Sequence, residues 1–282
     1  MTNFAIIGVA GFVAPKHLQA IKNIGGKVVL AHDVSDAVGV LDSYFPECFF
    51  YTNLQDFSTA IQQHSIDFLV VCTPNFLHVE HCIFGLMHNL NVICEKPLVL
   101  NTEEIILLKE RELEYNKKIY TILQLRLHEQ VQYIKNSIDN EKYYVGQLSY
   151  FTPRGNWYHQ SWKGIETKSG GIATNIGVHF FDMLCWFFGK IKHIELIEKN
   201  DTTSKGMLHF EKAKIHWHLC IDRNLEPTRK IILNDEEYIF TDGFHHLHTQ
   251  CYKNILEGNG FGIDENYAAT QVIYEIRNSN QP

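Results

Sequence analysis

The chain has 282 residues, of which 45% are hydrophobic and 20% are charged, and it carries a formal net charge of -7 at pH 7. This length can hold two domains, and the sequence has no run of about 18 apolar residues that could span a bilayer. Interspersed charges of both signs argue against a nucleic-acid surface and require no basic partner. We therefore expect a soluble, globular protein with no membrane segment and no nucleic-acid partner.

Composition also bears on compartment and on metal binding. The N-terminus enters an apolar run without a basic segment or a cleavage site, and the seven cysteines include no Cys-x-x-Cys pair. Both features favour a cytoplasmic protein with reduced cysteines. The histidine pairs His78 with His81 and His216 with His218 lack a matched set of cysteines or carboxylates, so we expect no metal site.

The first predicted elements are a strand over residues 3–7 and a helix over residues 15–24. Between them, small residues stand at Gly8, Gly11 and Ala14. They would let the backbone approach a pyrophosphate, whose negative charge is favoured at the start of a helix. This order of strand, tight turn and helix predicts a nucleotide-binding turn.

The same turn contains Phe12 and Val13, but Ala10 takes the place of the middle glycine in Gly-x-Gly-x-x-Gly, so the motif alone is weak. The next predicted strand, over residues 27–33, ends in Asp33, where a dinucleotide fold binds the ribose diol. Its carboxylate would accept hydrogen bonds from both ribose hydroxyls and repel a 2′-phosphate, which favours NAD over NADP. The alternative is that Asp33 caps the helix that follows.

The chain then repeats the order of strand and helix. Further strands are predicted over 48–51, 67–72, 91–94 and 118–123, with helices over 54–64, 76–89 and 102–116. Such alternation with short loops implies a mostly parallel sheet with right-handed crossovers. We expect residues 1–124 to form an NAD-binding domain.

One candidate cofactor turn follows the apolar strand over residues 67–72. In open α/β sheets, ligands bind beyond the carboxyl ends of the strands. Thr73, Pro74 and Asn75 would therefore face the cofactor. His78 lies just beyond this turn, and it either lines the cofactor site or is an ordinary residue of the helix start.

The turn after the strand over residues 91–94 carries the candidate chemistry as Glu95, Lys96 and Pro97. Proline fixes its own φ and pushes the preceding residue toward an extended backbone, so Lys96 would be aimed into the site. The alternative is a surface Lys-Pro turn. The position at the carboxyl edge of the sheet favours the functional interpretation.

In the second half, predicted strands no longer alternate with helices. They cover residues 143–153, 191–198, 206–210, 214–221, 229–233 and 237–240. Consecutive strands of this kind suggest a largely antiparallel sheet that is open on one face. The fold class is therefore α/β, and we expect residues 125–282 to bind the substrate and to mediate oligomerisation.

One long loop of the second half combines cations, aromatic rings and glycines. Its candidate ligand-binding residues are Arg154, Asn156, Trp157, Tyr158 and Lys163, with Trp162 and Lys168 nearby. Such a loop suits a ligand with a planar ring and several negative charges. The alternative is an irregular loop whose tryptophans pack inward.

An apolar helix is predicted over residues 172–189. Asn175, His179 and Asp182 stand at i, i+4 and i+7, and hence on one face of this helix. The polar stripe is either a hydrogen-bonded core network or a functional face. In the second case His179 points into the active site, and Asp182 fixes its tautomer.

Together these motifs resemble the glucose-fructose oxidoreductase, inositol dehydrogenase and MocA (Gfo/Idh/MocA) family. They are Gly8-x-x-Gly11-x-x-Ala14, Cys72-Thr73-Pro74-Asn75, Glu95-Lys96-Pro97 and Asn175-x-x-x-His179-x-x-Asp182. Within the family, the loop Arg154-Gly155-Asn156-Trp157-Tyr158 is similar to that of the UDP-N-acetyl-glucosaminuronate 3-dehydrogenases of the WlbA/WbpB type. Many relatives have aspartate where this chain has Asn175, which leaves His179 as the better base.

The resemblance implies an N-terminal Rossmann domain with bound NAD and a C-terminal α/β domain. It places the family's lysine at Lys96 and its histidine at His179 as the catalytic pair. The cofactor-binding residues expected from these arguments are Gly8, Gly11, Phe12, Val13, Asp33, Thr73, Pro74, Asn75, His78, Glu95 and Lys96. The substrate-binding residues expected are Arg154, Asn156, Trp157, Tyr158, Lys163, Asn175 and His179.

The implied reaction is oxidation of the 3-hydroxyl of UDP-N-acetyl-2-amino-2-deoxy-D-glucuronate to a ketone in surface-polysaccharide sugar biosynthesis (lipopolysaccharide and O-antigen). By resemblance only, 2-oxoglutarate would be a second substrate. Relatives form tetramers through the second sheet, so we expect a homo-tetramer, with Trp217, Tyr238 and Phe240 on the open face. The alternatives are another sugar or cyclitol dehydrogenase of the same superfamily, or a non-catalytic NAD-binding scaffold.

Overall fold

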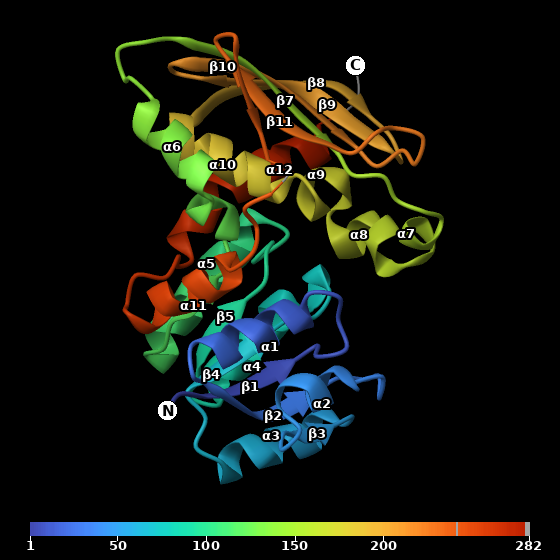
Figure 1. Cartoon of the computed structure of the whole chain (residues 1–282), viewed down its shortest axis with the longest axis vertical. Coiled ribbons are helices and arrows are strands. Elements are labelled where there is room, and N and C mark those ends of the chain that lie inside the picture. Colours follow the sequence, from blue (N-terminus) through green and yellow to red (C-terminus); the bar gives the residue numbers. More distant parts are fainter. Residues whose placement is uncertain (241, 280–282) are drawn as a thin grey trace. The chain divides into compact units, whose positions relative to one another are not determined.

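The structure is a computed structural model that describes residues 1–240 and 242–279. It divides into two compact units, each built on one six-stranded sheet (Figure 1). Unit 1 contains Met1–Val99, Glu103–Gln124 and His245–Glu265. Unit 2 contains Leu100–Thr102, Leu125–Phe244 and the chain from Asn266 onward. The predicted α/β fold class is confirmed.

The sheet of unit 1, sheet A, is entirely parallel, with strand order β3-β2-β1-β4-β5-β6. Its strands are β1 (Asn3–Ile7), β2 (Lys27–His32), β3 (Phe49–Tyr51), β4 (Phe68–Val71), β5 (Asn91–Cys94) and β6 (Ile119–Thr121). The central strands are apolar because helices cover both faces of the sheet. The parallel order brings the carboxyl ends of β1, β2, β4 and β5 to one edge.

Helices of unit 1 pack on both faces of sheet A. They are α1 (Ala14–Asn23), α2 (Val40–Tyr44), α3 (Leu54–Gln63), α4 (His78–Met87), α5 (Thr102–Tyr115) and α11 (Leu247–Leu256). Helices α3, α4 and α5 share one apolar core with the sheet, to which they contribute Phe57, Leu86 and Leu108. On the opposite face, α11 lies beside α1, and the ring of Tyr252 is 5.8 Å from that of Phe4 (Figure 1).

Residues 245–265 belong to unit 1 although they follow most of unit 2 in the chain. The backbone N–H of Thr121 at the end of β6 donates to the carbonyl of Phe261 at 2.8 Å. Thr249 on α11 accepts a hydrogen bond from Asn23 on α1 at 3.1 Å. Unit 1 is therefore completed by a returning segment, which a single boundary at residue 124 does not include.

The sheet of unit 2, sheet B, has strand order β12-β11-β7-β10-β9-β8. Its strands are β7 (Tyr144–Phe151), β8 (Ile191–Lys199), β9 (Thr203–Phe210), β10 (Ala213–Cys220), β11 (Thr228–Leu233) and β12 (Glu236–Ile239). Neighbouring strands are antiparallel except β7 and β10, which are parallel. The sheet is therefore mostly antiparallel, as predicted.

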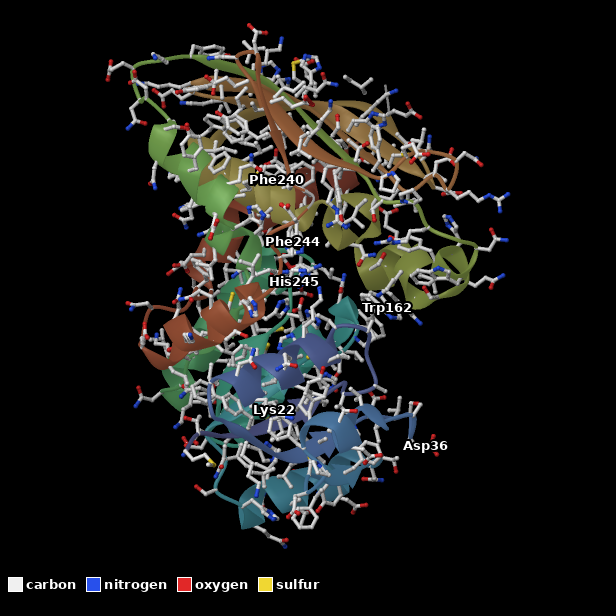
Figure 2. All side chains as sticks on the ribbon, in the orientation of Figure 1. Lys22, Asp36, Trp162, Phe240, Phe244 and His245 are labelled. Carbon is white, nitrogen blue, oxygen red and sulfur yellow. The ribbon has the colours of Figure 1, made fainter. Side chains whose placement is uncertain are left out.

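Helices of unit 2 cover one face of sheet B (Figure 1). They are α6 (Glu129–Ser137), α7 (Trp157–Gln160), α8 (Glu166–Ser169), α9 (Gly171–Asn175), α10 (Val178–Phe188) and α12 (Tyr267–Asn278), with short 3₁₀ turns at Gln124–Leu127 and Trp162–Gly164. Trp217 and Phe240 are fully buried in the core between sheet and helices, and Tyr238 packs against it. Phe240 is labelled in Figure 2. Their predicted place on the open face is wrong, because their side chains point to the covered face.

The helix predicted over residues 172–189 is instead two helices. Helix α9 ends at Asn175, and α10 begins at Val178 and ends before Gly189. At the break, a Cβ on Gly177 would lie 2.5 Å from the carbonyl oxygen of Ala173 and 2.6 Å from Leu219 of sheet B. Asn175 therefore does not share one helical face with His179 and Asp182.

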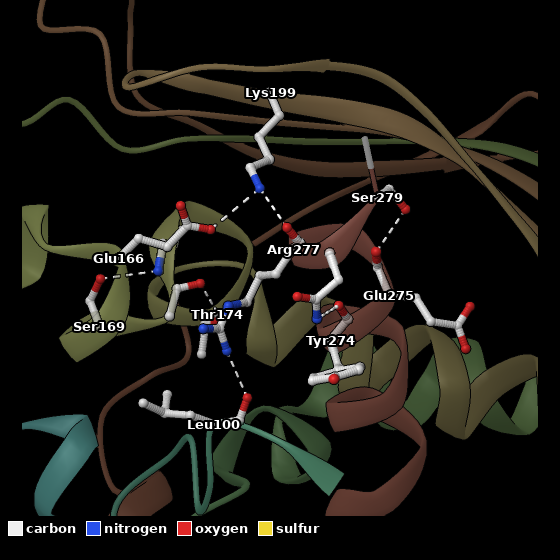
Figure 3. Close-up of polar contacts among 12 residues, drawn as sticks. Leu100, Glu166, Ser169, Thr174, Lys199, Tyr274, Glu275, Arg277 and Ser279 are labelled. Atoms are coloured by element: carbon white, nitrogen blue, oxygen red, sulfur yellow. Dashed lines mark hydrogen bonds and ion pairs between the residues drawn. The ribbon is translucent and has the colours of Figure 1, made fainter. Parts of the chain in front are cut away.

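Polar contacts tie the helices of unit 2 to its sheet (Figure 3). Lys199 on β8 donates to the carbonyl of Arg277 on α12 at 2.7 Å and lies 3.4 Å from the carboxylate of Glu166. Arg277 in turn donates to the carbonyl of Leu100 at 2.7 Å, which holds the short segment 100–102 in unit 2. Among the described residues, no single helix is long and apolar enough to cross a bilayer, although the segments Glu166–Asn175 and Val178–Phe188, bent by 50°, reach that length and composition together.

Candidate active site

The glycine-rich turn after β1 packs backbone to backbone against the turn after β4. Gly8 has φ +87°, and a Cβ there would lie 2.7 Å from the backbone of Cys72 and Thr73. A Cβ on Gly11 would lie 2.9 Å from the carbonyl oxygen of Gly8. Glycine is required at both positions because only it allows this approach. Two of the predicted cofactor segments thus lie together at the carboxyl edge of sheet A.

Asp33, at the end of β2, is tied to the same turn. One carboxylate oxygen accepts from the N–H of Ala10 at 2.9 Å, and the other accepts from the N–H of Ser35 at 3.0 Å. No helix starts directly after Asp33, since the next one begins at Val40, so the capping alternative is wrong. The large apolar side chains of Phe12, in the glycine-rich turn, and of Val34, next to Asp33 in the chain, are 93% and 88% exposed, so both are available to cover a ligand.

His78 links the two predicted turns at the carboxyl edge. Its Nδ1 lies 2.6 Å from the carbonyl oxygen of Pro97, and its Nε2 lies 2.8 Å from that of Thr73. Burial lowers the pKa of this imidazole, although the two carbonyls oppose that effect. Because the ring is buried, the structure favours a role in joining the turns over direct contact with a cofactor. Asn75, in the same turn, is also buried.

Glu95 is a buried carboxylate surrounded by hydrogen-bond donors. Its Oε1 lies 2.9 Å from Nε2 of His17 and 3.2 Å from Nε2 of His248, and its Oε2 accepts from the N–H of Lys96 at 3.2 Å. The Nδ1 of His17 lies 2.8 Å from the hydroxyl of Tyr252. Burial alone would raise the pKa of Glu95, but the bonds from both imidazoles outweigh it, so the pKa lies well below its usual value.

Sequence reasoning missed three members of this cluster, namely His17, His248 and Tyr252. His17 stood in a predicted helix and His248 in a histidine-rich stretch, and no spacing relates either of them to Glu95. His17, Glu95 and His248 each offer one possible metal-ligand atom, an imidazole nitrogen or a carboxylate oxygen. These three atoms lie within 4.8 Å of one another, close enough to share a metal ion. The same contacts have the lengths of hydrogen bonds.

Lys96 follows Glu95 at the end of β5 and is partly buried. Its peptide bond to Pro97 is cis. The N–H of Lys96 donates to Glu95, and the carbonyl of Pro97 accepts from Nδ1 of His78, so the backbone on both sides of the lysine is held by buried groups. Such support is what a positioned catalytic side chain needs.

In unit 2, the structure brings two of the predicted substrate residues together. The side-chain amide of Asn175 donates to the hydroxyl of Tyr158 at 2.8 Å. Tyr158 is only 2% exposed, and burial raises the pKa of its hydroxyl. Tyr158 therefore braces the loop against α9 and does not offer its ring to a ligand.

The rest of the candidate loop is more open. Trp157 is 53% exposed, and Asn156 beside it is exposed as well. Arg154 donates to the carbonyl of Pro153 at 3.3 Å, and the amine of Lys163 lies 3.9 Å from the ring centre of Trp162. Cationic and aromatic side chains thus lie on one loop of unit 2. Trp162 of this loop is labelled in Figure 2.

His179 lies partly exposed in the first turn of α10. Asp182, one turn further along, is buried, and both of its carboxylate oxygens accept from Arg126, at 2.9 and 2.6 Å. This two-fold pairing anchors α10 to the start of unit 2. Asp182 therefore has a structural partner that the polar stripe did not predict.

Two family profiles match the chain. An oxidoreductase family described as an NAD-binding Rossmann fold covers residues 2–122, and an oxidoreductase family described as a C-terminal alpha/beta domain covers residues 132–219. The order and content of these matches agree with the two sheets of the structure.

The fold is similar to that of solved dehydrogenases. The WlbA (WbpB) dehydrogenase from Thermus thermophilus in complex with NAD and alpha-ketoglutarate is 41% identical, with a TM-score of 0.96, over 100% of this chain and 97% of that chain. The complex of the same dehydrogenase with NAD and UDP-GlcNAcA gives 40% identity and a TM-score of 0.95, with coverage of 100% and 97%.

Among curated proteins, a 2,7-anhydro-N-acetylneuraminate hydratase from Mediterraneibacter gnavus is 27% identical over 66% of this chain and 49% of its own length. The chain spans about half the length of the curated relatives it matches. These matches are thus more distant and less complete than those to the solved dehydrogenases.

Proposed function

The chain belongs to the Gfo/Idh/MocA oxidoreductase family, and from that premise we propose that it oxidises the 3-hydroxyl of UDP-N-acetyl-2-amino-2-deoxy-D-glucuronate to a ketone with NAD. The observation that carries the proposal is 40% identity over the whole chain to a dehydrogenase solved with NAD and UDP-GlcNAcA. The loop chemistry of unit 2 supports it, because arginine, lysine and exposed tryptophan suit an anionic sugar nucleotide.

The residues at the carboxyl edge of sheet A fit a dinucleotide. Gly8 and Gly11 leave no side chain over the turn before α1, where the helix start favours a diphosphate. Asp33 is held with its carboxylate at the end of β2, where it would bind ribose hydroxyls. Exposed Phe12 would cover the cofactor, together with the partly exposed Val13, Thr73 and Pro74 of the adjoining turns, and buried Asn75 would support the second turn from behind.

When bound, NAD would supply the hydride acceptor. The chain's own task is to orient the sugar and to manage one proton. In our proposal His179 takes the proton of the 3-hydroxyl as general base. Lys96 donates a hydrogen bond to the same oxygen and stabilises the negative charge that develops there. Glu95 supports Lys96 through the backbone contact described above.

The substrate's anionic groups would be met by the loop of unit 2. Arg154 and Lys163 would pair with its carboxylate or diphosphate, while exposed Trp157 would stack on a planar ring. Asn156 would add a hydrogen bond. Asn175 and Tyr158 would act on the substrate indirectly, since their mutual hydrogen bond fixes the loop.

Three further features belong to the proposal. Alpha-ketoglutarate, bound in a structure of the Thermus thermophilus dehydrogenase, would be a second substrate that reoxidises NADH. The enzyme would act in the cytoplasm on nucleotide sugars for surface polysaccharide. It would assemble as a homo-tetramer through the open face of sheet B, on which Val145, His216 and Ile239 are exposed.

The test is turnover of the sugar nucleotide by the purified chain with NAD or alpha-ketoglutarate. We expect Lys96→Met and His179→Asn each to lower kcat by roughly 100-fold or more. The matched control is Lys192→Met, which removes an exposed lysine of β8 and should leave the rate unchanged. Oxidation of free sugars or cyclitols in preference to the UDP-sugar would point to a different dehydrogenase. Full turnover by both variants would contradict the assigned roles.

A further inference from the structure

The buried cluster around Glu95 contains more polar groups than the proposed reaction uses. The side chains of His17, Glu95 and Tyr252 are at most 6% exposed, and that of His248 is 9% exposed. They come from three places in the chain: α1, the end of β5 and α11. A cluster so deeply buried must satisfy every donor and acceptor internally.

The contacts define a consistent proton arrangement. With the imidazole of His17 neutral, the hydroxyl of Tyr252 donates to Nδ1 of His17, and Nε2–H of His17 donates to Oε1 of Glu95. Nε2–H of His248 donates to the same oxygen. Burial lowers the pKa of His17, which agrees with a neutral ring, and Glu95 is then an ionised carboxylate with its oxygens hydrogen-bonded.

The carboxylate connects this cluster to Lys96. Its second oxygen accepts from the backbone N–H of Lys96 at 3.2 Å, so the position of the carboxylate bears on the backbone that carries the amine. Two of the cluster's donors, His248 and Tyr252, lie on the returning segment 245–265. That segment therefore acts on the lysine's turn without contributing a residue to the turn itself.

We propose that His17, His248 and Tyr252 are positioning residues, which hold Glu95 as a carboxylate and thereby fix the backbone from which Lys96 reaches the substrate. The inference rests on the proposed function for its catalytic readout. It assigns the returning helix α11 a role in catalysis, which is to hold the turn that carries Lys96. We call the arrangement in which His17, His248 and Tyr252 hold Glu95 the clasp.

The clasp has a consequence for pH dependence. The titratable groups around Glu95 are His17 from α1, Cys72 after β4, His78 from α4, Cys94 from β5, the adjacent Lys96, and His248, Cys251 and Tyr252 from α11. Burial raises the pKa of the three thiols, so they stay neutral at pH 7. Without a histidine donor, burial would raise the pKa of Glu95, and the carboxylate would protonate at a higher pH.

The catalytic test compares His248→Phe, which keeps a ring without a donor, with His248→Gln, whose side-chain amide can donate from nearly the same place. We expect His248→Phe to lower kcat at pH 7 by roughly 10- to 100-fold, because a small misplacement of a catalytic group has effects of this size. The Kd for NAD should change little. The additional loss of kcat on acidification should begin at a higher pH in His248→Phe than in the wild type, because Glu95 then protonates at a higher pH, whereas His248→Gln should follow the wild-type pH profile.

Thr249→Val is the matched control, because it removes the hydrogen bond between α11 and α1 without touching Glu95. It should leave kcat and its pH profile unchanged. A merely structural role for His248 predicts the same fold loss at every pH and no rescue by glutamine. Either result would overturn the proposal.

A second measurement separates this inference from the proposed function. In ¹⁵N-histidine-labelled protein, nitrogen shifts should show His17 as a neutral ring protonated at Nε2 at pH 7, whether or not the UDP-sugar is the substrate. If wild-type protein fails to oxidise the UDP-sugar, the proposed function fails and the shifts of His17 still test the inference. A doubly protonated His17 ring would overturn it. So would one equivalent of bound transition metal that His248→Gln loses, because the cluster would then be a metal site.

Discussion

Gly8 shows how one backbone position joins two loops of the candidate site. Its φ of +87° and the 2.7 Å approach of the Cys72–Thr73 backbone are separate constraints, and a side chain would violate both. The cofactor turn is therefore built around the absence of a Cβ. At the middle position of the usual glycine motif this chain has Ala10, so a Cβ is tolerated there. The N–H of Ala10 donates to the carboxylate of Asp33.

The residue-scale prediction uses two glycines that share a positive φ but differ in surroundings. Gly8→Ala should destabilise the fold by about 3 kcal/mol or more, because backbone strain and a clash combine. Gly25 has φ +71°, and a Cβ added there would have nothing within 4 Å. Gly25→Ala should therefore lower the free energy of unfolding by only about 1–2 kcal/mol. Thermal and urea unfolding measure both, and titration with NAD should show weaker binding for Gly8→Ala alone. Equal losses of stability and affinity would refute the packing argument.

Single residues were predictable where local chemistry dictates them. Gly8, Gly11, Asp33 and Glu95 stand at the ends of apolar strands, and the parallel sheet brings such ends to one edge. The partners of Glu95 were not predictable, because His17 and His248 are 231 positions apart and meet only when α11 returns to α1. The hydrogen bond from Asn175 to Tyr158 was not predictable for a similar reason, since the two residues lie on different helices.

At the scale of elements, local patterns predicted the strands well and one helix badly. The strands Asn3–Ile7 and Asn91–Cys94 appear with the predicted bounds, because alternation with helices leaves little freedom. The helix expected over 172–189 breaks at Gly177, where close packing against Leu219 of β10 decides the path of the chain. Hydrophobic periodicity continues through that break and gave no sign of it.

Because the helix breaks at Gly177, Asp182 has a different role from the one predicted for it. On α10 it pairs with Arg126, which stands in the 3₁₀ turn where the chain enters unit 2. Arg126 also lies over the ring of Trp186, at 5.7 Å. The pair therefore fixes the first turn of α10, which carries His179, relative to the beginning of unit 2.

The element-scale prediction concerns this buried ion pair. Asp182→Asn should reduce the free energy of unfolding by about 3–5 kcal/mol, because it leaves a buried guanidinium without its counter-charge. The double variant Arg126→Met with Asp182→Leu should lose clearly less, since neither charge remains buried. Chemical denaturation of both variants measures the difference. A double variant that is less stable than Asp182→Asn would contradict the assignment.

At the scale of the whole molecule, the chain crosses between its two units several times. Segment 100–102 belongs to unit 2 and segment 245–265 to unit 1, so neither unit is one continuous stretch. The change from alternating to consecutive strands indicated that a second unit follows the first. It did not predict the returning helix, because α11 has the amphipathic pattern of any surface helix and its partner face lies on a distant part of the sequence.

The family assignment and the two sheets identify the molecule as an oxidoreductase of the dehydrogenase type. What distinguishes the proposed reaction from others of the family is the carbon that is oxidised and the sugar nucleotide that carries it. Neither the alternation of elements nor the fold decides that choice, because one fold supports several substrates. In our proposal the choice depends on the loop from Arg154 to Lys168 and on the pair Lys96 and His179.

The most direct measurement uses UDP-N-acetyl-2-amino-2-deoxy-D-glucuronate with deuterium at carbon 3 of the sugar. After incubation with the protein and NAD, the protein is denatured and the nucleotides are analysed by mass spectrometry. We predict deuterated NADH together with the 3-keto sugar nucleotide, and formation of both products slowed by roughly 100-fold or more in the Lys96→Met and His179→Asn variants. NADH without deuterium, or a sugar that keeps its label while NAD is reduced, would contradict oxidation at carbon 3.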